Sequence, residues 1–235
     1  MKKIYWLSLL LLAIGVIPAL AATGFTLFGN ATFISPGHNS NRAVQLIADA
    51  TAHPPVFSGI DFTVPATTTI DTLKTLSTDY NFTAASCSTG SPRFGIVLAD
   101  FPNATIFVYI GPPPNYTGCP PNVWANTGNL LTPTSFVDTT QLPGGAFYDP
   151  YAAAQARYSG QKVTDIFLVS DNGPGAGGLG SQTVLIDNTD VNGTTYDYEF
   201  ASKDDCKDGG WQNFTFAPGP FKNQGQCVSN FANGK

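Results

Sequence analysis

Hydrophobic and β-branched residues occur along the chain in short runs separated by Gly, Pro, Asn and Asp, a pattern typical of an all-β protein. The clearest group starts with an apolar run from Val163 to Val169, which residues 171–180 (DNGPGAGGLG) interrupt. A second run spans residues 184–186, and Asn192-Gly193 then marks a hairpin before an alternating segment. These residues predict three strands of a β-sheet core.

Further strands are predicted on the N-terminal side of this group. Residues 24–35 are expected to form one or two strands, with a break at Gly29-Asn30. Residues 70–80 combine helix-like spacing of apolar positions with many Thr and Ser residues, and are interpreted as a strand or irregular structure. Other strands are predicted at residues 43–48, 59–64, 94–98 and 105–110.

One helix is predicted at residues 149–157. Asp149 provides a capping side chain, Pro150 occupies the first turn, and an Ala-rich run follows. Upstream of this helix, residues 115–131 are rich in Pro and Asn and predict a long loop. A loop of this length usually needs a covalent link or has a function.

The first 21 residues have the pattern of a secretory signal peptide. Lys2 and Lys3 precede an apolar run, and Ala19-Leu20-Ala21 is a small-x-small cleavage site. The alternative is an uncleaved membrane anchor, because the run is about long enough to span a bilayer. Pro18 and the Ala-rich end favour cleavage after Ala21. We therefore expect a protein that is secreted or held at the cell surface.

The expected mature chain is acidic. Without Lys2 and Lys3, nine Lys and Arg remain against 16 Asp and Glu, a net charge of −7. Nucleic acids and anionic membrane surfaces both favour basic partners, so neither is expected to bind this protein. The mature sequence contains no second long apolar run. We therefore expect no membrane insertion after signal cleavage.

The four cysteines are Cys87, Cys119, Cys206 and Cys227. In a chain sent to an oxidising compartment, disulfides are the expected state, and three pairings are possible. Sequence proximity favours Cys87–Cys119 and Cys206–Cys227. A zinc site is disfavoured, because the sequence has no CxxC spacing and both histidines lie far upstream.

The many short strands predict a β-sandwich of the jelly-roll kind. Residues 30–49 (NATFISPGHNSNRAVQLIAD), residues 73–80 together with 90–94, and residues 182–193 (QTVLIDNTDVNG) resemble a secreted jelly-roll family. That family is similar in layout to the carbohydrate-binding modules of bacterial cell-wall and polysaccharide enzymes. The resemblance covers most of residues 24–200 and implies the architecture, whereas the ligand stays open.

The C-terminal residues form a separate unit. Cys206-Lys207-Asp208-Gly209-Gly210-Trp211 and the later residues 221–227 (FKNQGQC) resemble a short segment that recurs in exported microbial proteins. A segment of 35 residues is too small for a stable core without a covalent link. Trp211 is expected to pack within this segment or on the sandwich, and a ligand platform is the alternative. The expected organisation is a signal peptide at 1–21, a sandwich at 22–200 and a disulfide-closed segment at 201–235.

The sequence does not favour an enzyme. Glycoside hydrolysis usually needs two carboxylates, but the chain has a single Glu, Glu199, which is expected to face solvent on the last strand. His38 and His53 lie in turns beside Gly or Pro and are interpreted as surface loop residues, and no GxSxG motif is present. We therefore predict no catalytic residues, and a glycosidase is the least favoured hypothesis.

Calcium is the one cofactor that the jelly-roll resemblance suggests. Binding modules of this kind hold a structural calcium near the chain start and the penultimate strand, and calcium requires oxygen ligands. Asp187 with Asn188, or Asp171 with Asn172, would provide them, and Asp187 has the better position.

Aromatic residues between the strands are candidate sugar platforms, because a pyranose ring stacks on Trp or Tyr. The candidates are Tyr116, Trp124, Tyr148 and Tyr151, with Phe147 nearby. The alternative is that Trp124 packs the long loop and Tyr151 packs the helix. Six Asn-x-Ser/Thr sequons are expected in loops or on outward-facing strand positions. They begin at Asn30, Asn81, Asn103, Asn115, Asn192 and Asn213.

Two hypotheses on function follow from the sequence. The first is a non-catalytic module that binds glycan, such as a polysaccharide, at the cell surface or outside the cell. The second is a structural or adhesive surface protein that packs against copies of itself. Exposure of the candidate aromatic residues together on one concave face would favour the first hypothesis, and their separate burial would favour the second.

Overall fold

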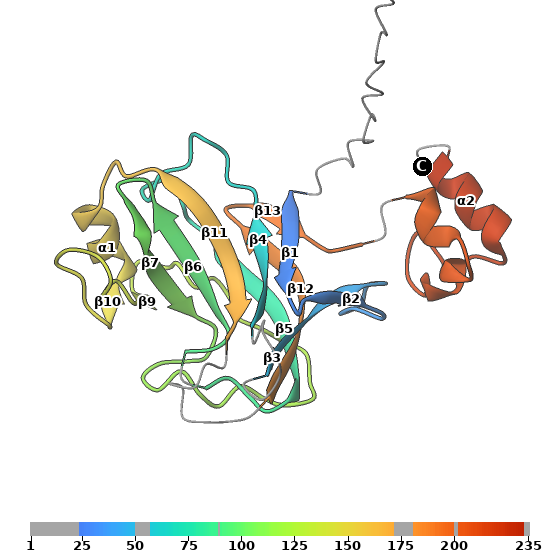
Figure 1. Ribbon diagram of the computed structural model, residues 1–235, viewed down its shortest axis with the longest axis horizontal. Helices are drawn as coiled ribbons and strands as arrows, with labels where there is room; N and C mark the ends of the chain where they lie inside the picture. Colours follow the sequence, from blue (N-terminus) through green and yellow to red (C-terminus); the bar gives the residue numbers. More distant parts are fainter. Residues whose placement is uncertain (1–23, 50–56, 89, 172–180, 200–201, 233–235) are drawn as a thin grey trace, which may run out of the picture.

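The computed structural model describes residues 24–49, 57–88, 90–171, 181–199 and 202–232 (Figure 1). Two antiparallel β-sheets form a sandwich, and a small helical segment follows at the C-terminus. The expected signal peptide and His53 lie outside the described residues. Within those residues, no helix combines the length and apolar character needed to cross a bilayer.

The first sheet has five strands in the order β1-β4-β11-β6-β7, and every neighbouring pair is antiparallel. Its central strand, β11, is the apolar run expected from the sequence. The strands are β1 (Phe25–Gly29), β4 (Ser58–Phe62), β6 (Arg93–Leu98), β7 (Phe101–Tyr109) and β11 (Val163–Ser170).

The second sheet has six strands, ordered β2-β3-β12-β5-β8, with β13 paired to β12. A separate two-stranded ribbon joins β9 to β10. The strands are β2 (Thr32–Ile34), β3 (Ala43–Asp49), β5 (Leu76–Ala84), β8 (Ala125–Asn126), β9 (Phe136–Val137), β10 (Asp149–Pro150), β12 (Ser181–Val191) and β13 (Thr194–Tyr196).

The all-β prediction is confirmed. The chain passes repeatedly from one sheet to the other, which is consistent with a jelly roll. Side chains alternate along each strand, so that every second residue enters the space between the sheets. The core residues include Val44, Leu46, Ile60, Phe62, Phe82, Phe94, Ile96, Ile106, Leu168, Val184 and Ile186.

The hairpin predicted at Asn192-Gly193 joins β12 to β13. Both residues have positive φ, 52° and 86°, as a tight hairpin turn of the Asn-Gly type requires. Upstream in β12, the register shifts between Asp187 and Asp190, and Asn188 also has a positive φ of 45°. This bulge changes the direction of polar side chains on the outer face of the sheet.

Residues 70–80, expected to be a strand or irregular, contain both, since residues 70–75 are irregular and β5 begins at Leu76. One local prediction differs from the structure. Helix α1 (Tyr151–Arg157) is present, but Asp149 does not cap it. Instead, the Asp149 carboxylate accepts hydrogen bonds from Thr139 and Arg157. Pro150 already presets the first turn, and these partners hold the acid away from the helix N–H groups.

The C-terminal segment contains the 3-10 turns η1 (Lys203–Cys206) and η2 (Gly210–Asn213), and helix α2 (Gln224–Ala232), which the sequence did not predict. It has its own small core around the buried Cys206–Cys227 disulfide, built from Phe214 and Phe221. Trp211 is partly buried against this core, so it packs within the segment, which was one of the two expected positions. In Figure 1 the segment lies beside β2.

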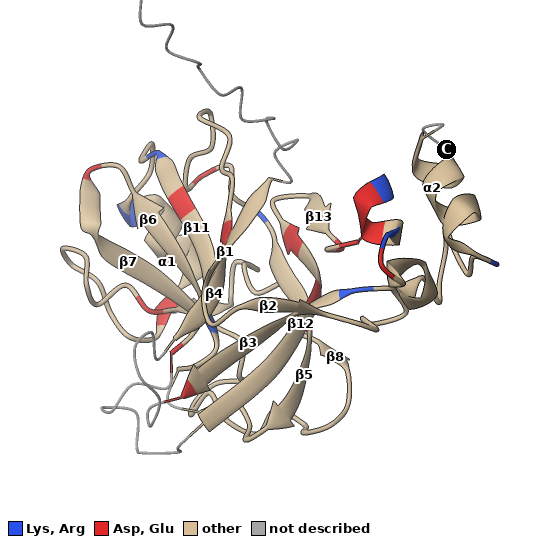
Figure 2. Ribbon diagram, turned by 45° about the vertical axis from the view of Figure 1, so that its right-hand side comes forward, with Lys and Arg blue, Asp and Glu red and all other residues tan. Residues whose placement is uncertain are grey.

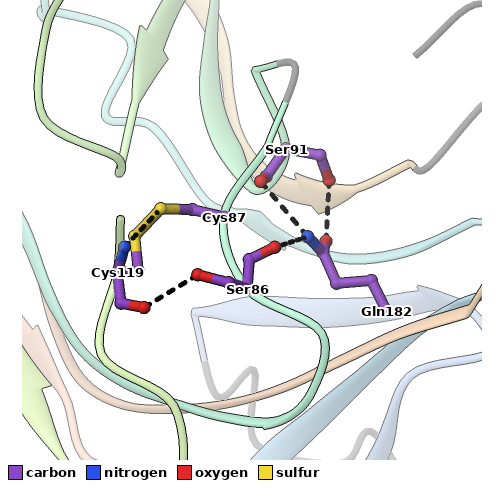
Figure 3. The surroundings of a disulfide bond; sticks show 5 residues. All are labelled: Ser86, Cys87, Ser91, Cys119 and Gln182. Carbon is purple, nitrogen blue, oxygen red and sulfur yellow. Dashed lines mark hydrogen bonds between the residues drawn. A yellow bond between two sulfur atoms is a disulfide. The ribbon is translucent and has the colours of Figure 1, made fainter. Parts of the chain in front are cut away.

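Both predicted disulfides are confirmed. Figure 3 shows that Cys87–Cys119 lies beside Gln182 of β12, which is 2% exposed. Gln182 accepts hydrogen bonds from Ser91 and Ser170 and donates one to the Ser86 carbonyl. Because Ser170 ends β11 and Gln182 belongs to the other sheet, this network ties the two sheets together at the end of the long loop.

Candidate functional site

The outer face of the five-stranded sheet carries a hollow of about 540 Å³. The alternation of side chains creates it. On β11, Ile166 and Leu168 are buried in the core, while Asp165 and Phe167 point outward and are only partly buried. The lining residues are Thr26, Phe28, Phe57, Asp61, Arg93, Thr105, Phe107, Gln141, Asp165, Phe167, Val169 and Asp171.

Two glycines let aromatic rings approach the backbone of this face closely. A Cβ atom at Gly95 would lie 2.2 Å from the Phe167 ring, and one at Gly59 would lie 2.2 Å from the Phe28 ring. Each ring therefore fills the space above a glycine where a side chain would otherwise project. Phe57, which is 42% exposed, adds a third ring 6.1 Å from Phe28. The hollow thus has a broad aromatic floor.

Two carboxyl groups lie together in the hollow. Asp61 on β4 and Asp165 on β11 both line the hollow, and Asp61 pairs in the strand register with Phe167, two residues from Asp165. Burial, followed by the charge and hydrogen bond of Asp165, raises the pKa of Asp61 to about 6. The two acids therefore lie close enough to interact in a partly buried site.

Arg93 forms one side of the hollow. Its guanidinium lies 4.4 Å from the centre of the Phe107 ring. It also donates to both carboxylate oxygens of Asp171, with Nη1–Oδ1 at 2.7 Å and Nη2–Oδ2 at 2.5 Å. Burial raises the pKa of Asp171, and the Arg93 charge opposes that rise. This bidentate pair neutralises the cation and fixes it against the ring.

An aromatic patch continues from the hollow. Phe107 and Tyr109 follow each other on the outer face of β7, with ring centres 6.5 Å apart. Tyr109 contacts Phe147 at 5.9 Å, and Phe147 contacts Tyr148 at 4.7 Å. Phe136 completes the patch, 5.9 Å from Tyr148. Phe136, Phe147 and Tyr148 are 41–44% exposed, so their rings are available to a ligand that extends beyond the hollow.

The four predicted sugar-stacking residues are divided between different environments. Tyr148 is 44% exposed and lies in the aromatic patch. Tyr116 stacks on Tyr148 but is itself 5% exposed, and Tyr151 is 1% exposed and donates to the carbonyl of Leu73. Trp124 precedes β8 at the edge of the other sheet. Of these four residues, only Tyr148 belongs to the exposed part of the aromatic surface.

Trp124 instead covers a polar cluster on the outer face of the six-stranded sheet. Its ring stacks on His38 with centres 5.0 Å apart. His38 Nδ1 lies 2.8 Å from an Asp79 carboxylate oxygen, which also accepts from Asn188. Asn126 donates to the other oxygen of Asp79. His38 lies in a loop, as expected, and its side chain is 31% exposed, but a distant strand supplies an acidic partner that the sequence did not indicate.

Asp187, the predicted calcium ligand, belongs to the same cluster. Its side chain is fully buried and accepts hydrogen bonds from the backbone N–H of His38, the Ser40 hydroxyl and the backbone N–H of Asn188. Burial raises the pKa of Asp187 to about 6. All three groups donate hydrogen bonds to the Asp187 carboxylate. Within the described ranges, no group of three or more His, Cys, Asp or Glu residues is placed to hold a metal.

Glu199 does not face solvent on a strand, contrary to the prediction. It lies beyond the end of β13 and is partly buried. Its carboxylate accepts from the backbone N–H and the side-chain amide of Asn41, both at 2.7 Å. The cause is tertiary, since Asn41 approaches from the loop before β3.

The sequons are mostly accessible. Asn30 is partly buried, and Asn81 has a buried amide oxygen without a hydrogen-bond partner in the described structure. The exposed members of the set are Asn103, Asn115, Asn192 and Asn213.

Sequence reasoning missed the hollow because its residues come from separate strands. One signal was present: Asp165 and Phe167 alternate with Ile166 and Leu168, which indicates an outward face that is both acidic and aromatic. Figure 2 shows how sparse charges are on the strands of the two sheets. Paired acids on neighbouring strands therefore stand out.

Comparisons with known proteins add little. No protein-family model and no curated protein matches the chain. One solved structure, described as "domains CD (residues 230-489)", is 14% identical with a TM-score of 0.34, over 71% of this chain and 62% of that one. The chain thus spans less than two thirds of that structure's length, and a likeness at this level supports no inference about function.

Proposed function

We propose that this is an exported, non-catalytic protein that binds glycan on the outer face of its five-stranded sheet. The observation that carries the proposal is the hollow whose floor is formed by the rings of Phe28, Phe57 and Phe167. A pyranose presents a face of C–H groups that packs on such rings, and its hydroxyl groups donate to nearby carboxylates.

The dimensions of the surface support a polymeric ligand. A volume of about 540 Å³ lies within the range of roughly 300–1,000 Å³ found for small-molecule sites. The aromatic patch of Phe136, Phe147 and Tyr148 extends the surface beyond the hollow. A chain of several sugar units would contact both parts.

Export is part of the proposal. It is supported by the N-terminal signal pattern and by the two disulfides, which persist in oxidising compartments. We expect the exported protein to begin at Ala22. N-terminal sequencing of secreted material tests this, and recovery of Met1 from that material would contradict it.

The binding proposal is tested by affinity electrophoresis of the mature protein in gels containing polysaccharides. Phe167→Ala and Phe107→Ala should each weaken retention about fivefold, because loss of one stacking contact costs about 1 kcal/mol. Tyr148→Ala should weaken retention of long polymers more than that of short oligomers.

Two aromatic variants serve as controls. Phe216→Ala removes an exposed ring of the C-terminal segment, and Trp124→Ala removes a ring at the opposite sheet. Neither should change retention, and thermal melting should show that all variants fold. The proposal fails if the wild-type protein is not retained by any polysaccharide, or if it releases reducing sugar.

A further inference from the structure

The charges in the hollow point to a more specific ligand. We infer that the hollow recognises an ammonium group, and that its ligand is a glycan with free amines, such as a polymer of glucosamine. The inference rests on the proposed function and assigns a ligand class to the same hollow. Three features support it. Two acidic side chains lack a cationic partner, aromatic rings lie in the same hollow, and the lining residues suit neither a metal ion nor an anion.

The acidic pair has no cationic partner in the described structure. Asp61 and Asp165 both line the hollow, and neither takes part in an ion pair among the described residues. Arg93 is the cation in the lining, and Asp171 holds it in a bidentate pair. The hollow therefore keeps a net negative charge that comes from Asp61 and Asp165.

The walls favour an organic cation. The face of an aromatic ring attracts cations electrostatically, and the attraction is strongest where water is excluded. Arg93 already shows this geometry over Phe107. Phe28, Phe57 and Phe167 offer further rings in the same hollow as the acids. An ammonium on a sugar ring would donate its N–H groups to the carboxyl pair while the sugar packs on the rings.

Other charged ligands fit less well. Calcium needs six or more oxygen ligands, whereas four of the residues that line this hollow are Phe. An anionic sugar would meet the uncompensated negative charge of Asp61 and Asp165. A neutral N-acetylated sugar would stack on the rings but could not neutralise the acids.

The test compares three tetrasaccharides by isothermal titration calorimetry with the full mature protein: the glucosamine tetramer, its N-acetylated form and a cello-oligosaccharide. The glucosamine tetramer should bind about tenfold more tightly than the other two. The double variant Asp61→Asn/Asp165→Asn should lose this preference while still binding neutral sugars. Added salt should weaken binding of the glucosamine tetramer more than binding of the two neutral tetrasaccharides.

A control variant separates the hollow from the general acidity of the chain. Asp208 is exposed on the C-terminal segment, and Asp208→Asn should leave the preference unchanged. Equal binding of the charged and acetylated tetramers would overturn the inference but leave the glycan-binding proposal in place. A preference that persists in the double variant would also overturn it. If none of the three tetramers binds and no polysaccharide retains the protein, the proposed function itself fails.

Discussion

The ring of Phe167 on β11 lies directly over Gly95 on the neighbouring strand β6. A Cβ atom at position 95 would approach three carbons of that ring to within 2.2–2.7 Å. Gly95 and Phe167 are paired in the strand register, so the ring fills the place of a missing cross-strand side chain. This relationship holds the ring close to the backbone of β6, where it lines the hollow.

Gly95→Ala should therefore displace the Phe167 ring. Overpacking of this kind costs about 1–3 kcal/mol of unfolding free energy, and glycan retention should fall with it. Chemical denaturation and affinity electrophoresis measure the two effects. Gly225→Ala is the matched control, because it lies in α2 with only an Asn223 side-chain oxygen near the added carbon. Unchanged stability and retention in Gly95→Ala would show that the ring moves freely.

Much of the fold could be predicted from local sequence. Apolar runs such as Val163 to Val169 gave the strands, and Asn192-Gly193 gave a hairpin whose two residues both have positive φ. Spacing alone favoured the disulfides that the structure contains. These features depend on residues that are near one another in the chain, or on a small number of possible pairings.

The candidate site could not be predicted in the same way. Asp61 and Asp165 lie more than 100 residues apart, and only the order β4-β11 in the sheet brings them together. Tyr151 was a candidate platform among the aromatic residues between the strands, with packing of the helix as the alternative, and its ring is buried with its hydroxyl donating to the Leu73 carbonyl. Exposure and cross-strand neighbours are properties of the tertiary structure.

The protein should become less stable as the pH rises from 3.8 to about 6. Asp61 and Asp187 have pKa values of about 6 in the folded protein, against an ordinary value of 3.8. The folded state therefore binds more protons, and this stabilisation is complete below pH 3.8 and lost as the pH rises through about 6. Asp79 acts in the opposite direction, because its pKa is lowered and its contribution disappears in acid.

Urea denaturation at several pH values between 3.8 and about 6 tests whether the free energy of unfolding falls as the pH rises. The free energy of unfolding should fall by about 1–3 kcal/mol across the window, most of it from buried Asp187. Asp187→Asn should flatten the profile, whatever its effect on absolute stability. Asp208→Asn, at an exposed position of the C-terminal segment, is the control and should keep the slope. A wild-type profile that rises throughout the window would contradict the assignment.

The Cys206–Cys227 disulfide should be essential to the C-terminal segment and dispensable for the sandwich. It closes 21 residues around a core with two buried Phe side chains, and a loop of this length contributes about 3 kcal/mol. In Cys206→Ser/Cys227→Ser, hydrogen exchange should show loss of protection in α2 but not in β11. In the wild-type protein, peptide mapping without reductant should recover the pairs 87–119 and 206–227. Protection of α2 from hydrogen exchange in the variant would contradict this prediction.

Asn41 should hold the C-terminal segment on the sandwich. Its side chain is fully buried and donates 2.7 Å to Glu199 and 3.0 Å to the Ala217 carbonyl, while its amide oxygen accepts from the Phe216 N–H at 2.7 Å. Asn41→Ala would remove the side-chain partner of the Ala217 carbonyl, the Phe216 N–H and one Glu199 oxygen, at a cost of about 1–3 kcal/mol, while the backbone N–H of residue 41 would still bond to the other Glu199 oxygen. Asn41→Asp should be worse, because it places a second carboxylate beside Glu199.

Limited proteolysis and hydrogen exchange over residues 214–217 measure this docking. Both Asn41 variants should expose the segment to cleavage while the sandwich stays protected, with the Asp variant cleaved faster than the Ala variant. Gln212→Ala changes an exposed amide of the same segment and should behave as wild type. If Asn41→Ala is cleaved no faster than this control, the Arg42–Asp205 ion pair at 3.8 Å, with the other contacts there, is sufficient to hold the segment.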